Sequence, residues 1–237
     1  MAETTIKALV FDVFGTVVDW RNSIAREAEA TLSPKGVVLD WLVFADRWRG
    51  KYQPSMERVR SGHRGYVRLD VLHHENLLEV LDEFGVMGLA EADTDHLNKA
   101  WHRLDPWPDC VEGLTRLKTR YILGTMSNGN VALMVNMAKH AGLPWDVILG
   151  AEPAQAYKPQ PDTYLTGVDW LGLEPGEVLM CAAHNDDLLA ARDCGLKTAF
   201  IARPREYGPD QDWDFKAEHD FDHITESMID LAEQMGC

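Results

Sequence analysis

The strongest constraint on the fold of this chain is a short apolar run near its N-terminus that ends on a carboxylate. The segment from Ile6 to Phe11 contains one lysine among five apolar residues, and its length and β-branched content predict a buried strand. Asp12 follows it directly, and residues 14–16 (Phe-Gly-Thr) have the character of a turn. A carboxylate at the tip of a buried parallel strand lies where open α/β sheets bind ligands. The alternative is an aspartate that only caps the next turn.

A long stretch without strand character follows, from about Trp20 to Leu104. Its apolar residues recur at helical spacing, for example at Leu77, Leu81 and Phe84. The segment from Asp105 to Asp109 ends this stretch, because its two prolines stop a helix and stiffen the return of the chain. We therefore expect a helical cap, residues 20–104, inserted directly after the first strand.

From Asp109 onward, expected helices and strands alternate. The helices cover residues 111–118, 131–140, 161–171, 188–194 and 224–235, and the strands cover residues 121–126, 147–149, 178–183 and 198–201, the last clear strand. Alternation of this kind implies a mostly parallel sheet covered on both faces, with every strand ending on one edge. We predict an α/β fold with a Rossmann-like core formed by residues 1–19 and 105–237.

Composition argues against several classes of partner. The 237 residues carry a formal net charge of -15 at pH 7, whereas nucleic acids and anionic membranes are bound by clustered lysine and arginine. No apolar run approaches the roughly 20 residues that a membrane span needs. The four cysteines form no CxxC pair, which predicts reduced thiols in a cytoplasmic protein.

Polar side chains follow four of the expected strands. They are Asp12, Ser127 with Asn128, Lys158, and the run from His184 to Asp187. Because parallel strands end on one edge of a sheet, these groups together describe a site. Lys158 is expected to keep Asp12 charged and positioned, and Ser127 and Asn128 offer donors to a carboxylate or phosphate oxygen. The alternatives are an exposed lysine and residues that only cap a helix.

These four motifs, in this order, resemble those of the haloacid dehalogenase superfamily. The matching segments are Asp12 to Thr16, Ser127-Asn128, Lys158-Pro159 and Asp187 to Gly195, and they span nearly the whole chain. The resemblance implies a Rossmann-like core with a cap and Asp12 as the nucleophile. Most members of the superfamily are Mg²⁺-dependent phosphatases, so the resemblance leaves the activity open.

Two departures from the phosphatase pattern favour another activity. Phe14 stands where phosphatases carry a second aspartate, and Ala182 and Ala183 stand where they carry an acidic metal ligand. Mg²⁺ needs hard oxygen ligands and neutralises a bound phosphate, so a small halogenated carbon suits this site better. The pattern is similar to that of the type II L-2-haloacid dehalogenases, and we expect neither a metal nor a cofactor.

This resemblance assigns a reaction to the site. Asp12 attacks C2 of a 2-haloalkanoic acid and forms an ester, and Arg49 of the cap receives the halide. Arg47 and Arg21 compete with Arg49 for this role. Water assisted by Asp187 as base then hydrolyses the ester, which yields a 2-hydroxyalkanoic acid of inverted configuration.

The remaining candidate site residues are expected to position the reacting groups or to bind the substrate. Lys158 positions Asp12, Thr16 steadies the loop, Ser127 and Asn128 orient the substrate carboxylate, Phe14 forms an aromatic wall, and Tyr164 matches a position of the family. His184 could hold the water, line the halide pocket, or be a neutral structural histidine. Asp186 competes with Asp187, although the spacing to Gly195 favours Asp187.

Two rival hypotheses stay open at this point. One is a phosphatase that recovers a metal site through Asp12, Asp186 and Asp187. The other is a non-catalytic protein that binds small carboxylates or a protein partner. The resemblance also implies a homodimer.

Overall fold

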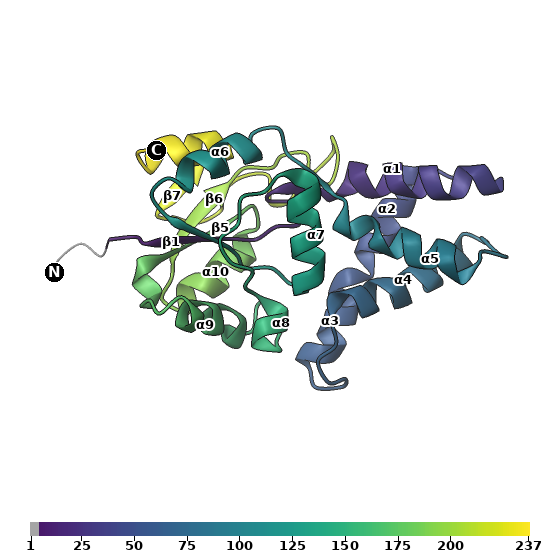
Figure 1. Cartoon of the computed structure of the whole chain (residues 1–237), viewed down its shortest axis with the longest axis horizontal. Coiled ribbons are helices and arrows are strands. Elements are labelled where there is room, and N and C mark those ends of the chain that lie inside the picture. Colours follow the sequence, from purple (N-terminus) through teal and green to yellow (C-terminus); the bar gives the residue numbers. More distant parts are fainter. Residues whose placement is uncertain (1–4) are drawn as a thin grey trace.

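The fold is organised around a five-stranded parallel sheet (Figure 1). The computed structural model describes residues 5–237; residues 1–4 of the expected core lie outside the described residues. The strands are β1 (Ala8–Phe11), β4 (Ile122–Thr125), β5 (Val178–Ala182), β6 (Lys197–Ile201) and β7 (His223–Thr225), in the order β4-β1-β5-β6-β7. All neighbouring strands are parallel, which confirms the predicted α/β fold.

Helices cover both faces of the sheet. One face packs on α6 (Cys110–Leu117), α7 (Val131–Ala141) and α11 (Met228–Gln234), and the other on α9 (Pro161–Trp170) and α10 (Asn185–Asp193). Side chains alternate between the two faces along a strand, so Leu9 and Phe11 of β1 join the first cluster and Ala8 and Val10 join the second. No helix within residues 5–237 combines the length and apolar character that crossing a lipid bilayer requires.

The helices α1 to α5 gather beyond the C-terminal ends of the strands (Figure 1). They are α1 (Trp20–Leu32), α2 (Trp41–Gly50), α3 (Tyr52–Arg60), α4 (Leu69–Glu83) and α5 (Glu91–Asn98), with 3-10 turns at Ser33–Lys35 and Lys99–His102. The chain enters and leaves this group through β2 (Val18–Asp19) and β3 (Asp105–Pro106), which pair antiparallel. The division into a cap of residues 20–104 and a two-part core stays a prediction, with β2 and β3 at its boundaries.

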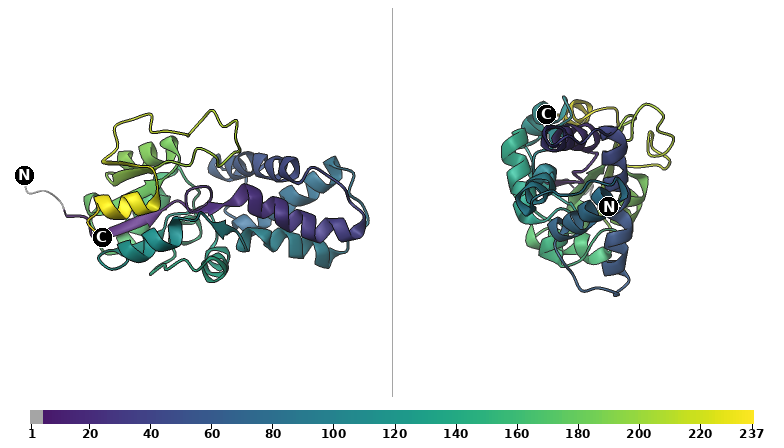
Figure 2. Two further views of the ribbon diagram at one scale, coloured as in Figure 1. Left: turned by 90° about the horizontal axis from the view of Figure 1, so that it is seen from above. Right: turned by 90° about the vertical axis from the view of Figure 1, so that its right-hand side faces the viewer.

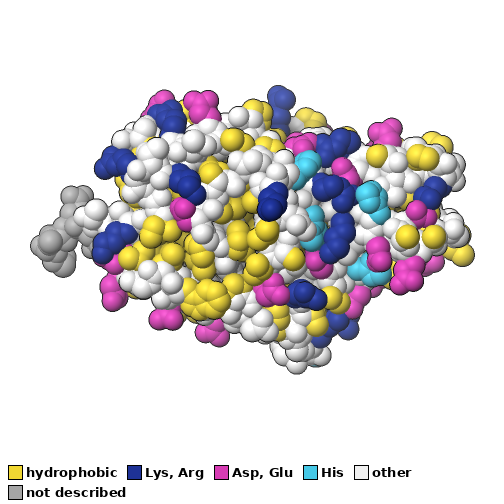
Figure 3. Space-filling model, viewed as in Figure 1, with side chains coloured by type: hydrophobic (Ala, Val, Ile, Leu, Met, Phe, Trp, Pro, Cys, Tyr) yellow, Lys and Arg dark blue, Asp and Glu magenta, His cyan; other side chains and the backbone are white. Residues whose placement is uncertain are grey.

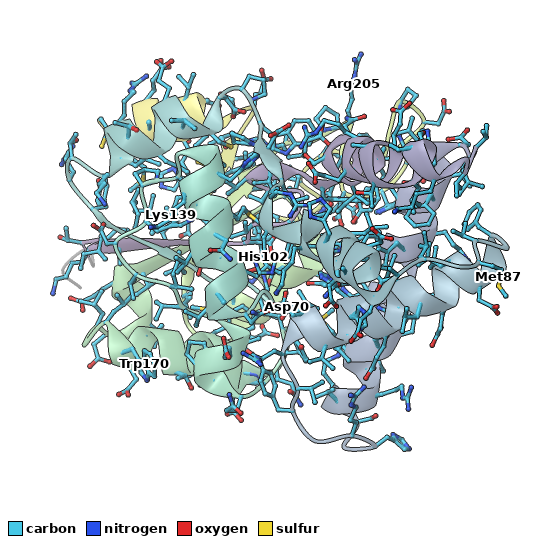
Figure 4. The ribbon with its side chains drawn as sticks, turned by 45° about the vertical axis from the view of Figure 1, so that its right-hand side comes forward. Asp70, Met87, His102, Lys139, Trp170 and Arg205 are labelled. Atoms are coloured by element: carbon cyan, nitrogen blue, oxygen red, sulfur yellow. The ribbon has the colours of Figure 1, made fainter. Side chains whose placement is uncertain are left out.

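Polar contacts join these helices to the sheet domain. The carboxylate of Asp70 in α4 accepts a hydrogen bond of 3.2 Å from Asn130, which precedes α7. Within the helical group, the same carboxylate lies 2.9 Å from His102 Nε2. Asp70 and His102 lie side by side in Figure 4. Arg60 of α3 donates to the backbone oxygen of Lys158 at 2.9 Å. These contacts hold the helices over the ends of the strands.

Two expected elements are wrong. Residues 147–149 form only isolated bridges, because the Thr125 hydroxyl bonds both the oxygen and the N–H of Leu149 at 2.8 and 3.0 Å in place of a regular ladder. The last helix begins at Met228, four residues later than expected, because His223–Thr225 adds β7 to the edge of the sheet. The strand at 197–201 is therefore not the last one.

Further differences concern the remaining helices. Helix α10 starts at Asn185, three residues before the expected start. A short helix, α8 (Ala151–Ala154), and a 3-10 turn at Pro175–Glu177 lie in stretches for which no helix was expected. These elements are one turn long, and hydrophobic periodicity needs a longer window to detect them.

The loop after β6 is anchored by a buried arginine. Arg203 donates to the backbone oxygen of Thr16 at 2.9 Å and to both carboxylate oxygens of Asp109 at 3.0 and 2.9 Å. Figure 2 shows the loop that begins here arching from the sheet toward the helices of the predicted cap. Arg203 therefore ties this loop both to the segment after β1 and to the start of α6.

We expect Arg203→Met to lower the free energy of unfolding by about 3 kcal/mol, because it leaves the Asp109 carboxylate without its partner. Urea unfolding followed by circular dichroism measures this loss. Arg205→Met is the matched control, since Arg205 lies two residues away and projects into solvent (Figure 4). Adding Asp109→Asn to the first variant should restore part of the loss; equal stability of Arg203→Met and the parent protein would contradict the prediction.

Candidate active site

Asp12 lies at the end of β1 with both carboxylate oxygens bound. Its backbone N–H donates to Cys181 O of β5 at 3.0 Å, which fixes the residue at the edge of the sheet. Oδ1 accepts from Lys158 Nζ at 2.9 Å, and Oδ2 lies 2.9 Å from Thr16 Oγ1 and 3.2 Å from His184 Nδ1. Burial alone would raise the pKa of Asp12, but Lys158 and His184 outweigh it and hold that pKa well below its usual range. The carboxylate is ionised in the resting protein.

Thr16 is a fixed donor to Asp12. Its hydroxyl oxygen accepts a hydrogen bond of 2.9 Å from the backbone N–H of Ala183, so its own hydrogen is free to point at Asp12 Oδ2. The turn that places Thr16 there passes through Gly15, whose φ of 88° favours glycine. The loop after β1 therefore presents the nucleophile candidate together with its donor.

Lys158 bridges two carboxylates. Its ammonium lies 2.9 Å from Asp12 Oδ1 and 2.5 Å from Asp187 Oδ2. Burial alone would lower the pKa of Lys158, but Asp12 and Asp187 raise it well above its usual value. Tyr164 donates to the other oxygen of Asp187 at 2.5 Å. Asp186 is exposed, so the structure brings Asp187 and not Asp186 next to Lys158.

His184 lies between two carboxylates. Its Nδ1 faces Asp12, and its Nε2 lies 2.9 Å from Glu206 Oε2. Only the imidazolium form has an N–H on both ring nitrogens. Burial alone would lower the pKa of His184, but Glu206 and Asp12 raise it well above 6.5. A protonated histidine therefore replaces the neutral structural histidine that the sequence left open.

Glu206 is a residue of this site that sequence reasoning missed. It is 1 % exposed although it lies just before an irregular, acidic segment, and it also accepts a hydrogen bond of 2.9 Å from Trp20 Nε1. Residues 207–223 contain many acidic residues, and nothing in the local sequence distinguishes the buried Glu206 from the solvated acidic residues that follow it. The available signal was that charged residues between Arg203 and Glu206 follow an expected strand, as the other predicted site residues do.

Arg49 is the arginine that reaches the site. Its guanidinium carbon lies 4.0 Å from the centroid of the Tyr52 ring and 5.8 Å from that of Phe14, and Nη1 is buried without a hydrogen-bond partner. Arg21 is instead bound at 2.7 Å by both oxygens of Asp46. Arg47 is exposed and pairs with Glu83. The unpartnered Nη1 offers Arg49 as a donor to an incoming anion.

A cavity of about 380 Å³ joins these groups, within the range of small-molecule sites. Its lining combines Asp12, Asn128, Lys158, His184, Asp186 and Asp187 of the core with Arg49, Tyr52 and Gln53 of the helices above, together with Pro159, Tyr207 and Asp214. A second cavity of about 410 Å³ shares Arg49, Tyr52, Gln53 and Tyr207 with it. The Arg49 side chain thus forms part of the wall of both cavities.

Three predicted binding residues, Ser127, Phe14 and Tyr164, do not line the cavity. Ser127 is buried, and its hydroxyl oxygen accepts from Gly129 N at 3.1 Å, which is a turn contact. Its neighbour Asn128 does line the cavity and accepts from Lys158 N at 2.8 Å. Phe14 lies behind the cavity, edge-on to Trp101 with ring centroids 5.8 Å apart.

The donor set does not fit a divalent metal ion. Ala182 and Ala183 offer no side-chain oxygen, and Phe14 replaces a possible carboxylate. The oxygens of Asp12 face an ammonium, a hydroxyl and an imidazolium. Mg²⁺ needs several hard oxygen ligands in octahedral geometry, and a cation at Asp12 would meet Lys158 and His184 at close range.

We expect His184 to be doubly protonated at about pH 7.5, because its pKa lies above that of a free histidine. Its ion pairs then stabilise the fold below the unfolded pKa of about 6.5, and this contribution is lost only as the pH rises through the higher folded value. Nitrogen NMR of ¹⁵N-histidine-labelled protein measures the protonation state of the His184 ring, and the His184→Asn variant assigns its signal. A neutral tautomer at this pH would contradict the assignment.

The sequence and the fold of this chain are similar to those of known proteins. The sequence profile described as haloacid dehalogenase-like hydrolase matches residues 6–195. The (S)-2-haloacid dehalogenase of Xanthobacter autotrophicus is 31 % identical over 205 residues, covering 84 % of this chain and 76 % of that protein. Among solved structures, the defluorinating L-2-haloacid dehalogenase Rha0230 is 48 % identical with a TM-score of 0.96, over 98 % of this chain and 96 % of that one. The L-2-haloacid dehalogenase PA0810 is also 48 % identical, with a TM-score of 0.94 over 98 % and 99 % of the two chains. On the profile match and the shared sequence, this chain belongs to the haloacid dehalogenase-like hydrolase family.

Proposed function

We propose that this protein hydrolyses 2-haloalkanoic acids to 2-hydroxyalkanoic acids and halide, through an ester on Asp12 and without a metal. The observation that carries the proposal is an ionised aspartate in a cavity whose neighbouring cations are protein side chains, Lys158 and His184. The similar proteins named as (S)-2-haloacid and L-2-haloacid dehalogenases support it. The phosphatase alternative is less supported, because the donor set around Asp12 does not fit Mg²⁺.

The first step is an in-line displacement at carbon. Asp12 attacks C2 of the substrate, the carbon–halogen bond breaks, and the halide leaves with the bonding electron pair. Arg49 Nη1, buried without a partner, is available to receive the halide. Asn128 lines the same cavity and orients the substrate carboxylate through its amide. Lys158 and Thr16 hold Asp12 in place during the attack.

The second step hydrolyses the ester. Water attacks the carboxyl carbon of Asp12 with Asp187 as general base. The bond from that carbon to the ester oxygen then breaks, and C2 keeps this oxygen in the product alcohol. Since only the first step touches C2, an (S) substrate yields an (R) product. Tyr164 and Lys158 both bind Asp187, which supports a fixed position for the base.

We extend the proposal to fluorinated acids. A relative that is 48 % identical over nearly the whole chain is named a defluorinating enzyme. Fluoride is the poorest leaving group among the halides, so its departure depends most on a charged donor that is not already occupied. Halide release from fluoro-, chloro- and bromoacetate shows which halogens the protein can remove. Release of chloride without fluoride would restrict the proposal to the heavier halogens.

Halide release from 2-chloropropionate should proceed unchanged in excess EDTA, and Asp12→Asn should reduce it by about 10⁴-fold or more, as loss of a covalent nucleophile does. In ¹⁸O-water, repeated turnover should label the Asp12 carboxylate, because water attacks the protein carbon. Mass spectrometry of the peptide that contains Asp12 detects the label. A requirement for Mg²⁺ together with hydrolysis of p-nitrophenyl phosphate would favour the phosphatase instead.

Arg49→Lys should lower kcat/KM for halide release by about 100-fold, because an ammonium on a flexible stem cannot reproduce the planar donors at the leaving group. Arg47→Lys is the matched control from the same helix and should stay within about twofold of the parent protein. Initial rates measured with a halide electrode decide the point. Equal effects of the two substitutions would remove Arg49 from its role.

We also propose that the protein acts in the cytoplasm as a homodimer. The four cysteines are all unpaired, as is usual in a reducing compartment. The helices α7 and α9 carry exposed apolar side chains, namely Val131, Val135, Leu165 and Trp170. Apolar surface also gathers on the face shown in Figure 3. Light scattering of the purified protein tests the dimer, and a monomer at micromolar concentration would argue against it.

A further inference from the structure

The buried carboxylate of Glu206 has no role in the reaction derived so far. It is 1 % exposed, and its two oxygens contact the Trp20 indole N–H and His184 Nε2, both at 2.9 Å. A buried charge is costly unless it is paired and hydrogen-bonded. The pairing with His184 places Glu206 one side chain away from the nucleophile.

The loop after β1 is shaped to admit Glu206. A Cβ atom on Gly15 would lie 2.0 Å from Glu206 Oε1, so any other residue at position 15 would displace the carboxylate. Arg203 fixes the loop that carries Glu206 by binding Thr16 O and Asp109. The backbone just after Asp12 therefore acts on Glu206 twice. Gly15 leaves room for the carboxylate, and the backbone oxygen of Thr16 binds Arg203 in the loop that carries Glu206.

The two oxygens of Asp12 have different neighbours. Oδ1 contacts the Lys158 ammonium, which also contacts Asp187. Oδ2 contacts the Thr16 hydroxyl and His184 Nδ1. If Oδ1 carries the substrate carbon in the ester, Oδ2 is the carbonyl oxygen, and two donors already face the position where negative charge develops when water attacks.

We propose that His184 stabilises the oxyanion on Asp12 Oδ2 during ester hydrolysis, and that Glu206 is the positioning residue that keeps His184 charged and aimed at that oxygen. This inference rests on the proposed function. His184 is a catalytic residue of the second step, whereas Glu206 acts only through it. An imidazolium beside Oδ2 withdraws electron density from the carboxylate, so it gives no advantage to the attack on C2.

Hydrolysis of the ester returns Asp12 to a free carboxylate. Asp187 takes one proton from water as the bond between the water oxygen and the Asp12 carboxyl carbon forms, and the carbonyl electron pair moves onto Oδ2 beside His184. The pair returns, the bond from the carboxyl carbon to Oδ1 breaks, and Oδ1 leaves with the product. The proton held by Asp187 passes to Oδ1 through Lys158, which contacts both groups. The remaining water proton leaves the Asp12 carboxyl group for solvent.

The test separates the two chemical steps with Glu206→Gln, which keeps the shape of the side chain and removes its charge. Rapid mixing with 2-chloropropionate measures the burst of halide, steady-state assays measure turnover, and intact-protein mass spectrometry measures the ester. We expect the burst rate to stay within about threefold, turnover to fall by about tenfold or more, and the ester to accumulate. Glu112→Gln, on the exposed side of α6, is the matched control and should leave all three unchanged.

His184→Asn provides a second variant if Glu206→Gln does not fold, and it should show the same accumulation of ester. Equal losses in burst and turnover, or no loss in either, would overturn the role of the Glu206 and His184 pair. Absence of halide release from the parent protein would overturn the proposed function itself. Halide release by the parent protein without ester accumulation in either variant would overturn this inference alone.

Discussion

The structure depends most on the ionic contacts of Asp12. The carboxylate is buried at the edge of a parallel sheet, where it meets Lys158 on one oxygen and His184 on the other. Two unit charges about 4 Å apart interact by about 4 kcal/mol at an effective dielectric constant near 20, and an unpaired buried charge costs several kcal/mol. These contacts with protein side chains thus keep a carboxylate ionised in a partly enclosed cavity.

These contacts are possible because of the topology. The strands β1 and β5 are neighbours in the sheet, so the residues that follow them, Asp12 and His184, meet at one edge. The loop after β6, a further strand along, returns over this edge and adds Glu206 (Figure 2). Residues separated by more than 190 positions are thereby brought within one hydrogen-bond network.

The helices of the predicted cap complete the site with aromatic surface. Phe14 lies edge-on to Tyr52, His73 and Trp101, with ring centroids 6.3, 6.3 and 5.8 Å apart. Burial lowers the pKa of His73 to about 3, so this ring is neutral and packs as an aromatic group. Such packing excludes water behind the cavity. Charged groups interact more strongly where water is excluded, so the aromatic surface strengthens the ionic contacts of Asp12.

How much the sequence could predict differed between parts of the site. Asp12 and Asp187 come after β1 and β5, whose apolar patterns are clear, so the sheet rule was enough to expect them together. Lys158 was expected at the same edge from a strand at 147–149, and these residues form only isolated bridges. The choice between Arg47 and Arg49 needed the phase of α2, because residues two apart on a helix point about 200° apart and only packing decides which of them faces inward. Arg21, on α1, was set aside by its contact with Asp46, which the sequence does not show. Thr125 disrupted the expected strand at 147–149 through a side-chain contact that periodicity does not encode. Glu206 depends on long-range contacts with Trp20 and His184, which no local pattern records.

The placement of Glu206 has a consequence for how such proteins are classified and engineered. The family profile covers residues 6–195, so the carboxylate that accompanies His184 lies outside the segment by which the chain is recognised. Two homologues could share every motif in that segment and still differ in the electrostatics of their nucleophile. A chimera that exchanged the C-terminal segment would keep the family signature and lose a partner of its central histidine.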